Sequence, residues 1–193
     1  MPELLFATNN KNKIKEIKAG LSEHWNIIGL QEAGINIEIP EPHQTLEENA
    51  KEKAWTIHQL TGLPCFSEDT GLEVRVLNGE PGVFSARYAG EQADATMNMD
   101  KLLLNMLGKS DRSARFRTVI ALVWKGEIKF FEGICNGQIT ESPKGNNGFG
   151  YDPIFIPDGS DLHFGEMEME QKNKFSHRKK ALQQLLKYLQ QNG

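Results

Sequence analysis

The chain has 193 residues and a formal net charge of −4, and its 38% apolar and 25% charged residues are ordinary for a globular protein. This charge argues against a general nucleic-acid-binding protein, because nonspecific affinity for nucleic acid comes from many Lys and Arg contacts to phosphate. A small anionic ligand is compatible with it, since a few convergent cations suffice. The longest apolar stretch, residues 118–124, is far shorter than the roughly 20 residues that a membrane helix needs.

The N-terminal sequence MPELLFATNN lacks the basic-then-apolar order of a signal peptide. The two cysteines, Cys65 and Cys135, lack the CxxC or CxxH spacing of zinc ligands, and two isolated cysteines do not make a disulfide framework. We therefore expect a cytoplasmic protein in which both cysteines are buried thiols.

Apolar periodicity predicts strands that alternate with helices. The clearest local signal is the capping box of Thr45 and Glu48 at the start of a helix. A turn at Lys125-Gly126 joins two strands into a long hairpin. In chain order, the predicted elements are a strand at 3–7, a helix at 12–21, a strand at 26–30, a helix at 45–60, a strand–turn–strand unit at 65–76 with its turn at 68–71, a helix at 93–107, strands at 115–125 and 127–134, and a helix at 176–189.

Strands interleaved with helices are typical of an α/β layered domain, and the hairpin makes its sheet mixed rather than purely parallel. The length of the chain predicts one domain over residues 1–193.

The polar segment TNNKNK, residues 8–13, lies between the first strand and the first helix. Backbone N–H groups and the positive end of the helix dipole favour an anion such as phosphate at this kind of junction. The alternative is a polar turn that only caps the helix, and the segment lacks the glycines of a P-loop.

Three acids form a second group of candidates: Glu41 after Pro40, and the pair Glu68-Asp69. Carboxylates at strand ends or in tight turns can point to one place, and Mg²⁺ takes a few oxygen ligands together with waters and substrate phosphates. The alternative interpretation is a solvated Asp-Thr-Gly turn without a metal.

Two further motifs lie in the second half of the chain. The sequence GNNGFGYDP, residues 145–153, places aromatic rings between glycines, which let the backbone approach a flat base, and Phe149 offers a stacking face. The sequence KNKFSHR, residues 172–178, precedes the last helix, and Ser176 is a candidate N-cap. The alternatives are a glycine-rich hairpin loop that buries one aromatic ring and a solvated basic patch.

The order of these motifs along one chain is more specific than any of them alone. TNNKNKIKE, then SEDTGLEV with NGEPGVFSARYAG, then GFGYDPIF and KNKFSHRKKAL resemble the Ham1-like inosine triphosphate pyrophosphatases, which act on non-canonical purine nucleotides. The resemblance extends from Leu5 to Leu182. It implies an elongated mixed sheet flanked by helices, two lobes around a central cleft, and a homodimer.

The resemblance also implies roles for individual residues. Asp69 is the catalytic carboxylate, Glu41 and Asp69 are ligands of Mg²⁺, and Arg178 is a donor to the 6-oxo group that hypoxanthine and xanthine carry and adenine lacks. One departure is Asn9, where the family often has Gly; Asn tolerates a left-handed backbone better than most residues. The residues that the resemblance places against the nucleotide are Thr8, Asn9, Asn10, Lys11, Asn12, Lys13, Lys53, Thr70, Phe149, Gly150, Tyr151, Asp152, Lys172, His177 and Arg178.

The implied reaction is attack of water on the α-phosphorus of a nucleoside triphosphate, which releases the monophosphate and pyrophosphate. Asp69 would orient and deprotonate the water, and Lys13 and Lys172 would supply fixed positive charge. Two other functions stay open: a pyrophosphatase for other modified nucleotides, and a nucleotide-binding regulatory module without turnover. The three acids count against the module, because a pure anion binder gains nothing from carboxylates unless a metal bridges them.

Overall fold

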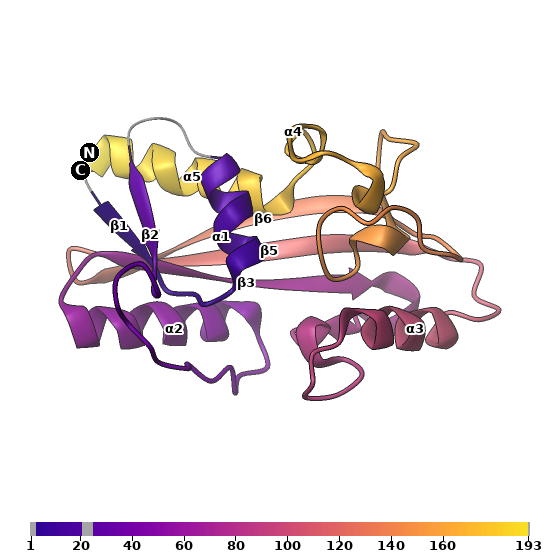
Figure 1. Ribbon diagram of the computed structural model, residues 1–193, viewed down its shortest axis with the longest axis horizontal. Helices are drawn as coiled ribbons and strands as arrows, with labels where there is room; N and C mark the ends of the chain where they lie inside the picture. Colours follow the sequence, from indigo (N-terminus) through magenta and orange to yellow (C-terminus); the bar gives the residue numbers. More distant parts are fainter. Residues whose placement is uncertain (1–2, 21–24, 193) are drawn as a thin grey trace. The chain divides into compact units, whose positions relative to one another are not determined.

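The computed structural model describes residues 3–20 and 25–192. Its strands form a mixed sheet in the order β2-β1-β3-β5-β6-β7, with β4 paired to β3 (Figure 1). β1 runs parallel to both β2 and β3, whereas β4 and β7 run antiparallel to their neighbours. The strands are β1 Glu3–Phe6, β2 Asn26–Gly29, β3 Cys65–Val74, β4 Pro81–Gly82, β5 Ser113–Trp124, β6 Glu127–Ile139 and β7 Phe155–Pro157. The helices are α1 Lys11–Ala19, α2 Leu46–Thr61, α3 Ala95–Asn105, α4 Met169–Lys172 and α5 His177–Asn192.

These elements confirm the predicted α/β fold with a mixed sheet flanked by helices. The predicted helical position Leu21 lies outside the described residues. Among the residues that the structure describes, no helix is both long and apolar enough to cross a membrane. The chain divides into two compact units: unit 1 comprises Met1–Asp69, Thr118–Gly133 and Arg178–Gly193, and unit 2 comprises Thr70–Arg117 and Ile134–His177.

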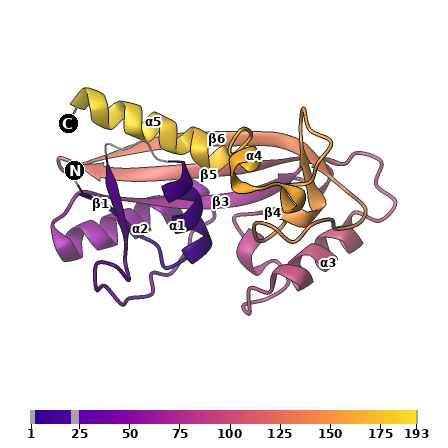
Figure 2. The ribbon, with the colours of Figure 1, turned by 45° about the horizontal axis from the view of Figure 1, so that its top comes forward.

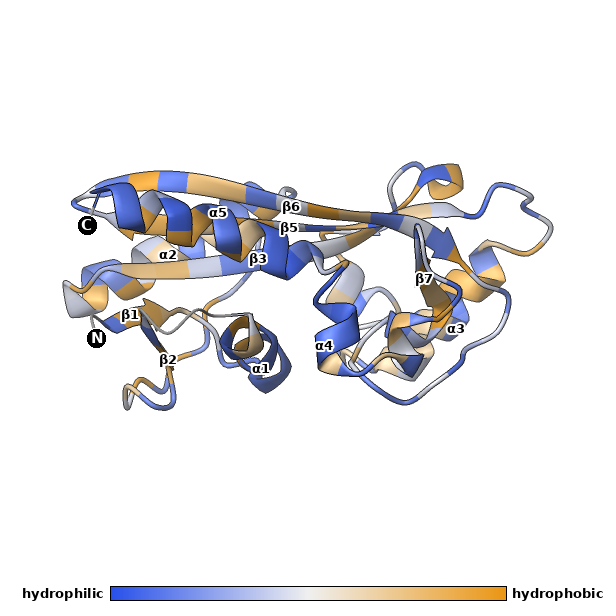
Figure 3. Cartoon of the chain, turned by 90° about the horizontal axis from the view of Figure 1, so that it is seen from above, coloured by the Kyte–Doolittle hydropathy of each residue, from blue (hydrophilic) through white to orange (hydrophobic). Residues whose placement is uncertain are grey.

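In unit 1, α1 and α5 cover one face of the sheet and α2 covers the other. Successive side chains of a strand point to opposite faces, so Leu4 and Phe6 pack with α5, whereas Leu5 and Ala7 pack with α2. The amphipathic pattern of α5 is visible in Figure 3. Its apolar residues Ala181, Leu182, Leu185, Leu186 and Leu189 are all buried, as the sequence predicts.

The N-cap predicted at Thr45 is confirmed, with the Glu48 side chain bonded to the Thr45 hydroxyl. The hydroxyl of Thr45 accepts a hydrogen bond from the backbone N–H of Glu48 and donates one to the Glu48 carboxylate. At the other end, Gly62 adopts a left-handed conformation with φ of 68°, which ends the helix. Helix α2 is therefore held at both ends, which fixes the side chains that it directs at β3.

Unit 2 has its own apolar core. Leu102 and Met106 of the α3 region pack with Phe116 of β5 and with Phe155 and Phe164. Asp94 caps α3 by accepting a hydrogen bond from the N–H of Met97. β4 pairs with the second half of β3 through Leu72 and Glu73 (Figure 2).

The hairpin of β5 and β6 turns at Lys125 and Gly126, as predicted. Both residues have positive φ, 52° and 78°, which is the conformation that the type I′ hairpin turn requires. β6 continues to Ile139, five residues beyond its predicted end at Ile134, because its last residues pair with β7. Their turn-like sequence Asn136-Gly137 concealed this pairing.

The predicted turn at residues 68–71 is wrong: Cys65–Val74 is one continuous strand. Gly71 serves close approach rather than a turn, because a Cβ atom there would lie 2.5 Å from the carbonyl oxygen of Gly82 in β4. The solvated-turn interpretation fails with it, since Glu68 and Asp69 are only 1% and 5% exposed.

Candidate functional site

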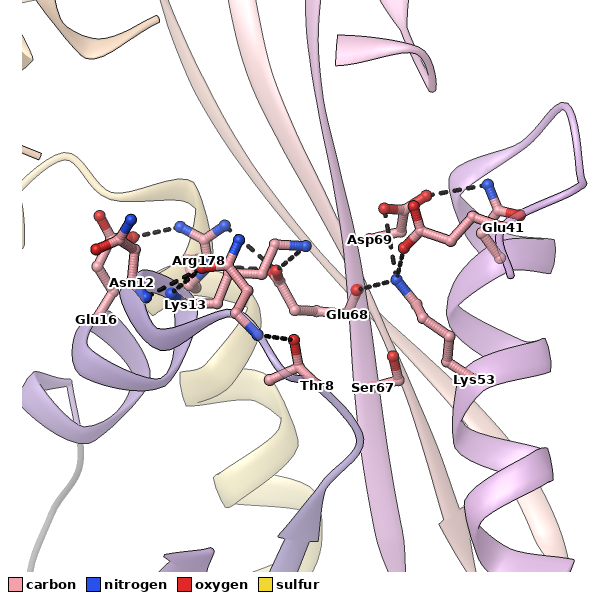
Figure 4. Close-up of polar contacts among 12 residues, drawn as sticks. Thr8, Asn12, Lys13, Glu16, Glu41, Lys53, Ser67, Glu68, Asp69 and Arg178 are labelled. Atoms are coloured by element: carbon pink, nitrogen blue, oxygen red, sulfur yellow. Dashed lines mark hydrogen bonds and ion pairs between the residues drawn. The ribbon is translucent and has the colours of Figure 1, made fainter. Parts of the chain in front are cut away.

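Two neighbouring carboxylates of β3, Glu68 and Asp69, lie in unit 1 and point to opposite faces of the sheet (Figure 4). Asp69 points to the face covered by α2, and Glu68 to the face covered by α1 and α5. The alternation of side chains along a strand dictates this arrangement. The two acids therefore belong to two separate clusters of charges.

The cluster around Asp69 is built on Lys53 of α2. The ammonium of Lys53 forms ion pairs with Glu41 and, at 3.7 Å, with Oδ1 of Asp69, and it donates to the Glu68 carbonyl oxygen at 2.9 Å. Asn49, one turn earlier on α2, donates from Nδ2 to Oδ2 of Asp69 at 3.2 Å. Glu41 and Asp69 are thus brought together around the Lys53 ammonium.

The electrostatics favour a proton-accepting role for Asp69. Burial disfavours its charged form and raises its pKa above the ordinary value, although the positive charges of Lys53 and Lys13 oppose this shift. A carboxylate with a raised pKa is a better general base near neutral pH than an ordinary one.

The donor set of this cluster suits a hard cation with an incomplete protein shell. Glu41 and Asp69 supply carboxylate oxygens, the ligands that Mg²⁺ prefers. Within residues 3–20 and 25–192, no group of three or more His, Cys, Asp or Glu side chains is placed to hold a metal by itself. An ion held here would therefore take its other ligands from water and substrate phosphate, which is how Mg²⁺ usually binds in proteins.

The cluster around Glu68 is built on Arg178, the second residue of α5, which is only 2% exposed. Arg178 donates from Nε and Nη2 to the two oxygens of Glu68, at 3.0 and 3.3 Å, and its Nη1 bonds to Glu16 of α1. Lys13 adds an ion pair to Glu68 at 2.8 Å. Two acids and two bases thus compensate one another in a buried network.

The charges in this network fix its protonation. Burial alone would raise the pKa of Glu68, but Arg178 and Lys13 outweigh it and hold the pKa far below the ordinary value. Burial alone would lower the pKa of Lys13, but Glu68 and Asp69 raise it. The side chains of Glu68, Lys13 and Arg178 are therefore all charged at neutral pH.

The polar segment 8–13 caps α1. The side-chain oxygen of Asn10 accepts from the backbone N–H groups of Asn12 and Lys13, and Thr8 accepts from the N–H of Asn10. These three N–H groups already have partners, so a phosphate at this segment would have to bind side chains such as Lys13 rather than a row of open backbone donors. Capping of the helix is the alternative that the sequence left open for this segment.

Asn9 does not use the left-handed backbone that its position suggested. The non-glycine residues with positive φ, among those that the structure describes, are Asn78, Ala93 and Lys125. Asn9 instead donates from its side chain to the carbonyl oxygen of Ile37 at 2.8 Å. Where the family often has Gly, this chain has a link to the segment that leads to Glu41.

Unit 2 has a buried ion pair of its own, between Lys172 and Asp152. Lys172 donates to Oδ2 of Asp152 at 2.5 Å, and the same oxygen accepts from the backbone N–H of Phe149 at 2.8 Å. The Lys172 ammonium lies 5.4 Å from the centre of the Phe149 ring. Gly148 is required beside it, because its φ is 73° and a Cβ atom there would overlap the Asp152 carboxylate.

Of the other predicted residues of unit 2, Gly150, Tyr151 and His177 lie close to this ion pair in sequence, whereas Thr70 does not. The hydroxyl of Tyr151 donates to the carbonyl oxygen of Ser85 at 2.8 Å, which locks its ring into the core. His177 is buried and stacks on Phe116, with ring centres 4.8 Å apart. Thr70 is partly buried, and Gly150 has a φ of 60°.

The chain matches the model of the Ham1 family over residues 4–188. It belongs to the Ham1 family. It is 51% identical to a dITP/XTP pyrophosphatase of Flavobacterium johnsoniae and 49% identical to one of Porphyromonas gingivalis, covering 97% and 98% of both chains, respectively. Among solved structures, the Ham1 proteins of Staphylococcus aureus and Coxiella burnetii give TM-scores of 0.88 and 0.89 at 37% identity, covering 99% of this chain and all of theirs.

The predicted residues of this Ham1 family chain divide between the two units. Residues 8–13, Glu41, Lys53, Asp69 and Arg178 belong to unit 1, whereas Thr70, residues 149–152, Lys172 and His177 belong to unit 2.

Two buried contributors to unit 1, Glu16 and Asn49, were missed by the sequence analysis. A signal for each exists: Glu16 follows Lys13 by three residues, and Asn49 precedes Lys53 by four, spacings that place each pair on one helix face.

Proposed function

We propose that this chain is a pyrophosphatase for non-canonical purine nucleoside triphosphates, which hydrolyses ITP, dITP and XTP to the monophosphate and pyrophosphate. The observation that carries the proposal is the convergence of Glu41 and Asp69 on Lys53 in a chain whose relatives are named dITP/XTP pyrophosphatases. The cofactor in the proposal is Mg²⁺, bound by Glu41 and Asp69. When bound, the ion supplies positive charge to the phosphate oxygens and to the leaving pyrophosphate.

In the proposed mechanism, Asp69 accepts a proton from the water that attacks the α-phosphorus. Lys53 and Asn49 fix its two oxygens. The side chains of residues 8–13 bind the triphosphate, with Lys13 as the fixed charge. Positioned charges of this kind stabilise the transition state without reorganisation during the reaction.

The aromatic and charged residues of unit 2 are proposed to bind the rest of the nucleotide. Phe149 stacks on the base, and Lys172, held by Asp152, supplies positive charge. Thr70, Gly150, Tyr151 and His177 complete the proposed contacts. In this proposal, residues 1–193 form one pyrophosphatase domain. The protein is cytoplasmic and a homodimer.

For Arg178 the contacts support a role in positioning other side chains, besides the base contact that the resemblance implied. Its guanidinium binds Glu68 and Glu16 in its own unit. We therefore assign it the positioning of Glu68 and, through Glu68, of Lys13. The direct contact with a 6-oxo group stays a prediction, and the selectivity measurement described in the Discussion separates the two roles.

A screen of pyrophosphate release tests the proposed function. ITP, dITP, XTP and the four common ribonucleoside triphosphates are compared, each with and without Mg²⁺. We expect pyrophosphate only with the metal and fastest from the 6-oxo substrates without a 2-amino group. Nucleotide binding without pyrophosphate release would identify a regulatory module, and faster release from one of the common triphosphates would identify a different pyrophosphatase.

A further inference from the structure

The residue Glu41 lies on a segment with no helix or strand, whereas its partner Asp69 lies on the central strand β3. This segment, residues 35–43, belongs to the connection between β2 and α2. Its first half is anchored by Ile35, Ile37 and Ile39, which pack on the apolar cluster beneath α2. Residues 40–43 carry no comparable apolar anchor, so polar contacts must set the position of Glu41.

The side chain of Asn49 supplies these contacts. It is completely buried, and its Oδ1 accepts from the backbone N–H of His43 at 3.0 Å, while its Nδ2 donates to the His43 carbonyl oxygen at 3.3 Å. The same Nδ2 donates to Oδ2 of Asp69 at 3.2 Å. One amide therefore ties the backbone two residues after Glu41 to the carboxylate that Glu41 must face.

The orientation of this amide is determined by its partners. Its surroundings offer one N–H donor and two oxygen acceptors, which match one amide oxygen and one NH₂ group. A flipped amide would set its oxygen against the oxygens of His43 and Asp69. Asn49 is thus a specific connector, and neither Asp nor Leu, which have similar volumes, reproduces its pattern.

Two successive turns of helix α2 contact both Asp69 and the 35–43 segment. Lys53 contacts Asp69 and Glu41 by charge, and Asn49 contacts Asp69 and His43 by hydrogen bonds. Each oxygen of Asp69 receives one partner from the helix. Asn9 provides a second brace, because its side chain holds the Ile37 carbonyl oxygen from the opposite end of the segment.

We propose that Asn49 is a positioning residue that holds Glu41 opposite Asp69, with Asn9 as a second brace of the 35–43 segment. The proposal rests on the proposed function in that it treats the two carboxylates as a metal site. It gives Asn49 a role in cation affinity beyond its contribution to stability, since groups that orient metal ligands typically affect affinity by about 10–100-fold.

The principal test compares Asn49→Ala with Thr45→Ala in the full chain. Thr45→Ala removes the cap of the same helix and destabilises it, typically by about 1 kcal/mol, but Thr45 makes no contact with Glu41 or Asp69 in the hydrogen bonds and ion pairs described above. Two quantities are measured without substrate: Mn²⁺ binding, from the free ion signal in electron paramagnetic resonance, and hydrogen exchange of a peptide that covers residues 35–43.

We expect Asn49→Ala to weaken Mn²⁺ binding about tenfold or more and to accelerate exchange in the 35–43 segment, including the N–H of His43. Thr45→Ala should leave both at the wild-type level. Equal changes in the two variants, or wild-type Mn²⁺ binding in a folded Asn49→Ala protein, would overturn the proposal.

Asn9→Ala keeps the test decisive if Asn49→Ala does not fold, because Asn9 is exposed. We expect faster exchange around residue 37 and several-fold weaker Mn²⁺ binding, whereas the matched surface variant Asn26→Ala should change neither. Unchanged exchange in Asn9→Ala would reject the brace. If the wild-type protein binds Mn²⁺ but releases no pyrophosphate from any nucleotide, the proposed function fails while the positioning of Glu41 still stands or falls on these measurements.

Discussion

Replacing Arg178 by Met tests the buried charge network of unit 1. The substitution keeps a long, flexible side chain and removes the three hydrogen bonds to Glu68 and Glu16 described above. Both carboxylates stay buried, with Lys13 as the base that pairs with Glu68. Leaving acids buried without their guanidinium is far more costly than losing a surface ion pair.

The magnitude follows from this burial. Removing one partner of a buried ion pair costs about 3–5 kcal/mol. In a chain of this length, about 2–4 °C of melting temperature corresponds to 1 kcal/mol, so Arg178→Met should lower the melting temperature by about 6–20 °C.

Thermal unfolding by circular dichroism measures this effect, with Arg75→Met as the control. Arg75 is 80% exposed and its nitrogen lies 3.7 Å from Asp111, a surface pair worth about 1 kcal/mol or less. An equal loss of stability in the two variants would refute the assignment of Arg178 to a stabilising network.

The same variant separates the two roles of Arg178. If Arg178 positions Glu68 and Lys13, the specificity constants for ITP and ATP should fall together and their ratio should stay constant. If Arg178 donates to the 6-oxo group, only the ITP reaction loses a charged hydrogen bond, and the ratio should fall by about one to two powers of ten. A selective loss with unchanged stability would refute the positioning role.

Four further predictions follow from the proposed site and the core. Asp69→Asn should reduce turnover about a hundredfold or more while melting stays cooperative; a loss of only a few-fold in a pyrophosphate assay would remove Asp69 from the chemistry. Lys13→Ala should lower the specificity constants of all triphosphates together, and a base-selective drop would contradict its assignment to phosphate. EDTA should abolish pyrophosphate release and added Mg²⁺ should restore it. Because burial raises the pKa of Cys65 to about 12, and Cys135 is buried too, a thiol reagent at pH 8 should react with neither until the protein is unfolded; rapid labelling of the native protein would refute this.

The sequence predicted best the features that local chemistry controls. The cap at Thr45, the turn at Lys125-Gly126 and the apolar face of α5 depend on residues close in the chain, and all three are confirmed. The turn expected at Gly71 failed, because the need for glycine there comes from β4, a strand that pairs from a later part of the chain. A local pattern cannot distinguish these two uses of glycine.

The site shows the same limit. The resemblance grouped Glu41 with Asp69, and the structure places both against Lys53, while their roles stay predictions. The partners of Arg178 did not follow from the sequence, since Glu16 is 162 residues away and Glu68 is 110 residues away. Asn49 was overlooked because a single Asn in a helix also fits an exposed position, and only its contacts with His43 and Asp69 show its use.

The opposite orientation of Glu68 and Asp69 makes the loop before β3 a determinant of chemistry. The pairing of Leu5 with Cys65 sets the register of β3, and side chains alternate between its two faces. An acid an odd number of positions after Cys65 therefore faces Arg178, and one an even number after it faces Lys53. Deleting one residue from the 62–64 loop would, if the strand slid to compensate, bring Asp69 to the place of Glu68 beside Arg178 and leave Thr70 in the place of Asp69 beside Lys53. The length of this loop is therefore constrained. Changing it by two residues keeps each side chain of the strand on the same face of the sheet and should be tolerated better than changing it by one.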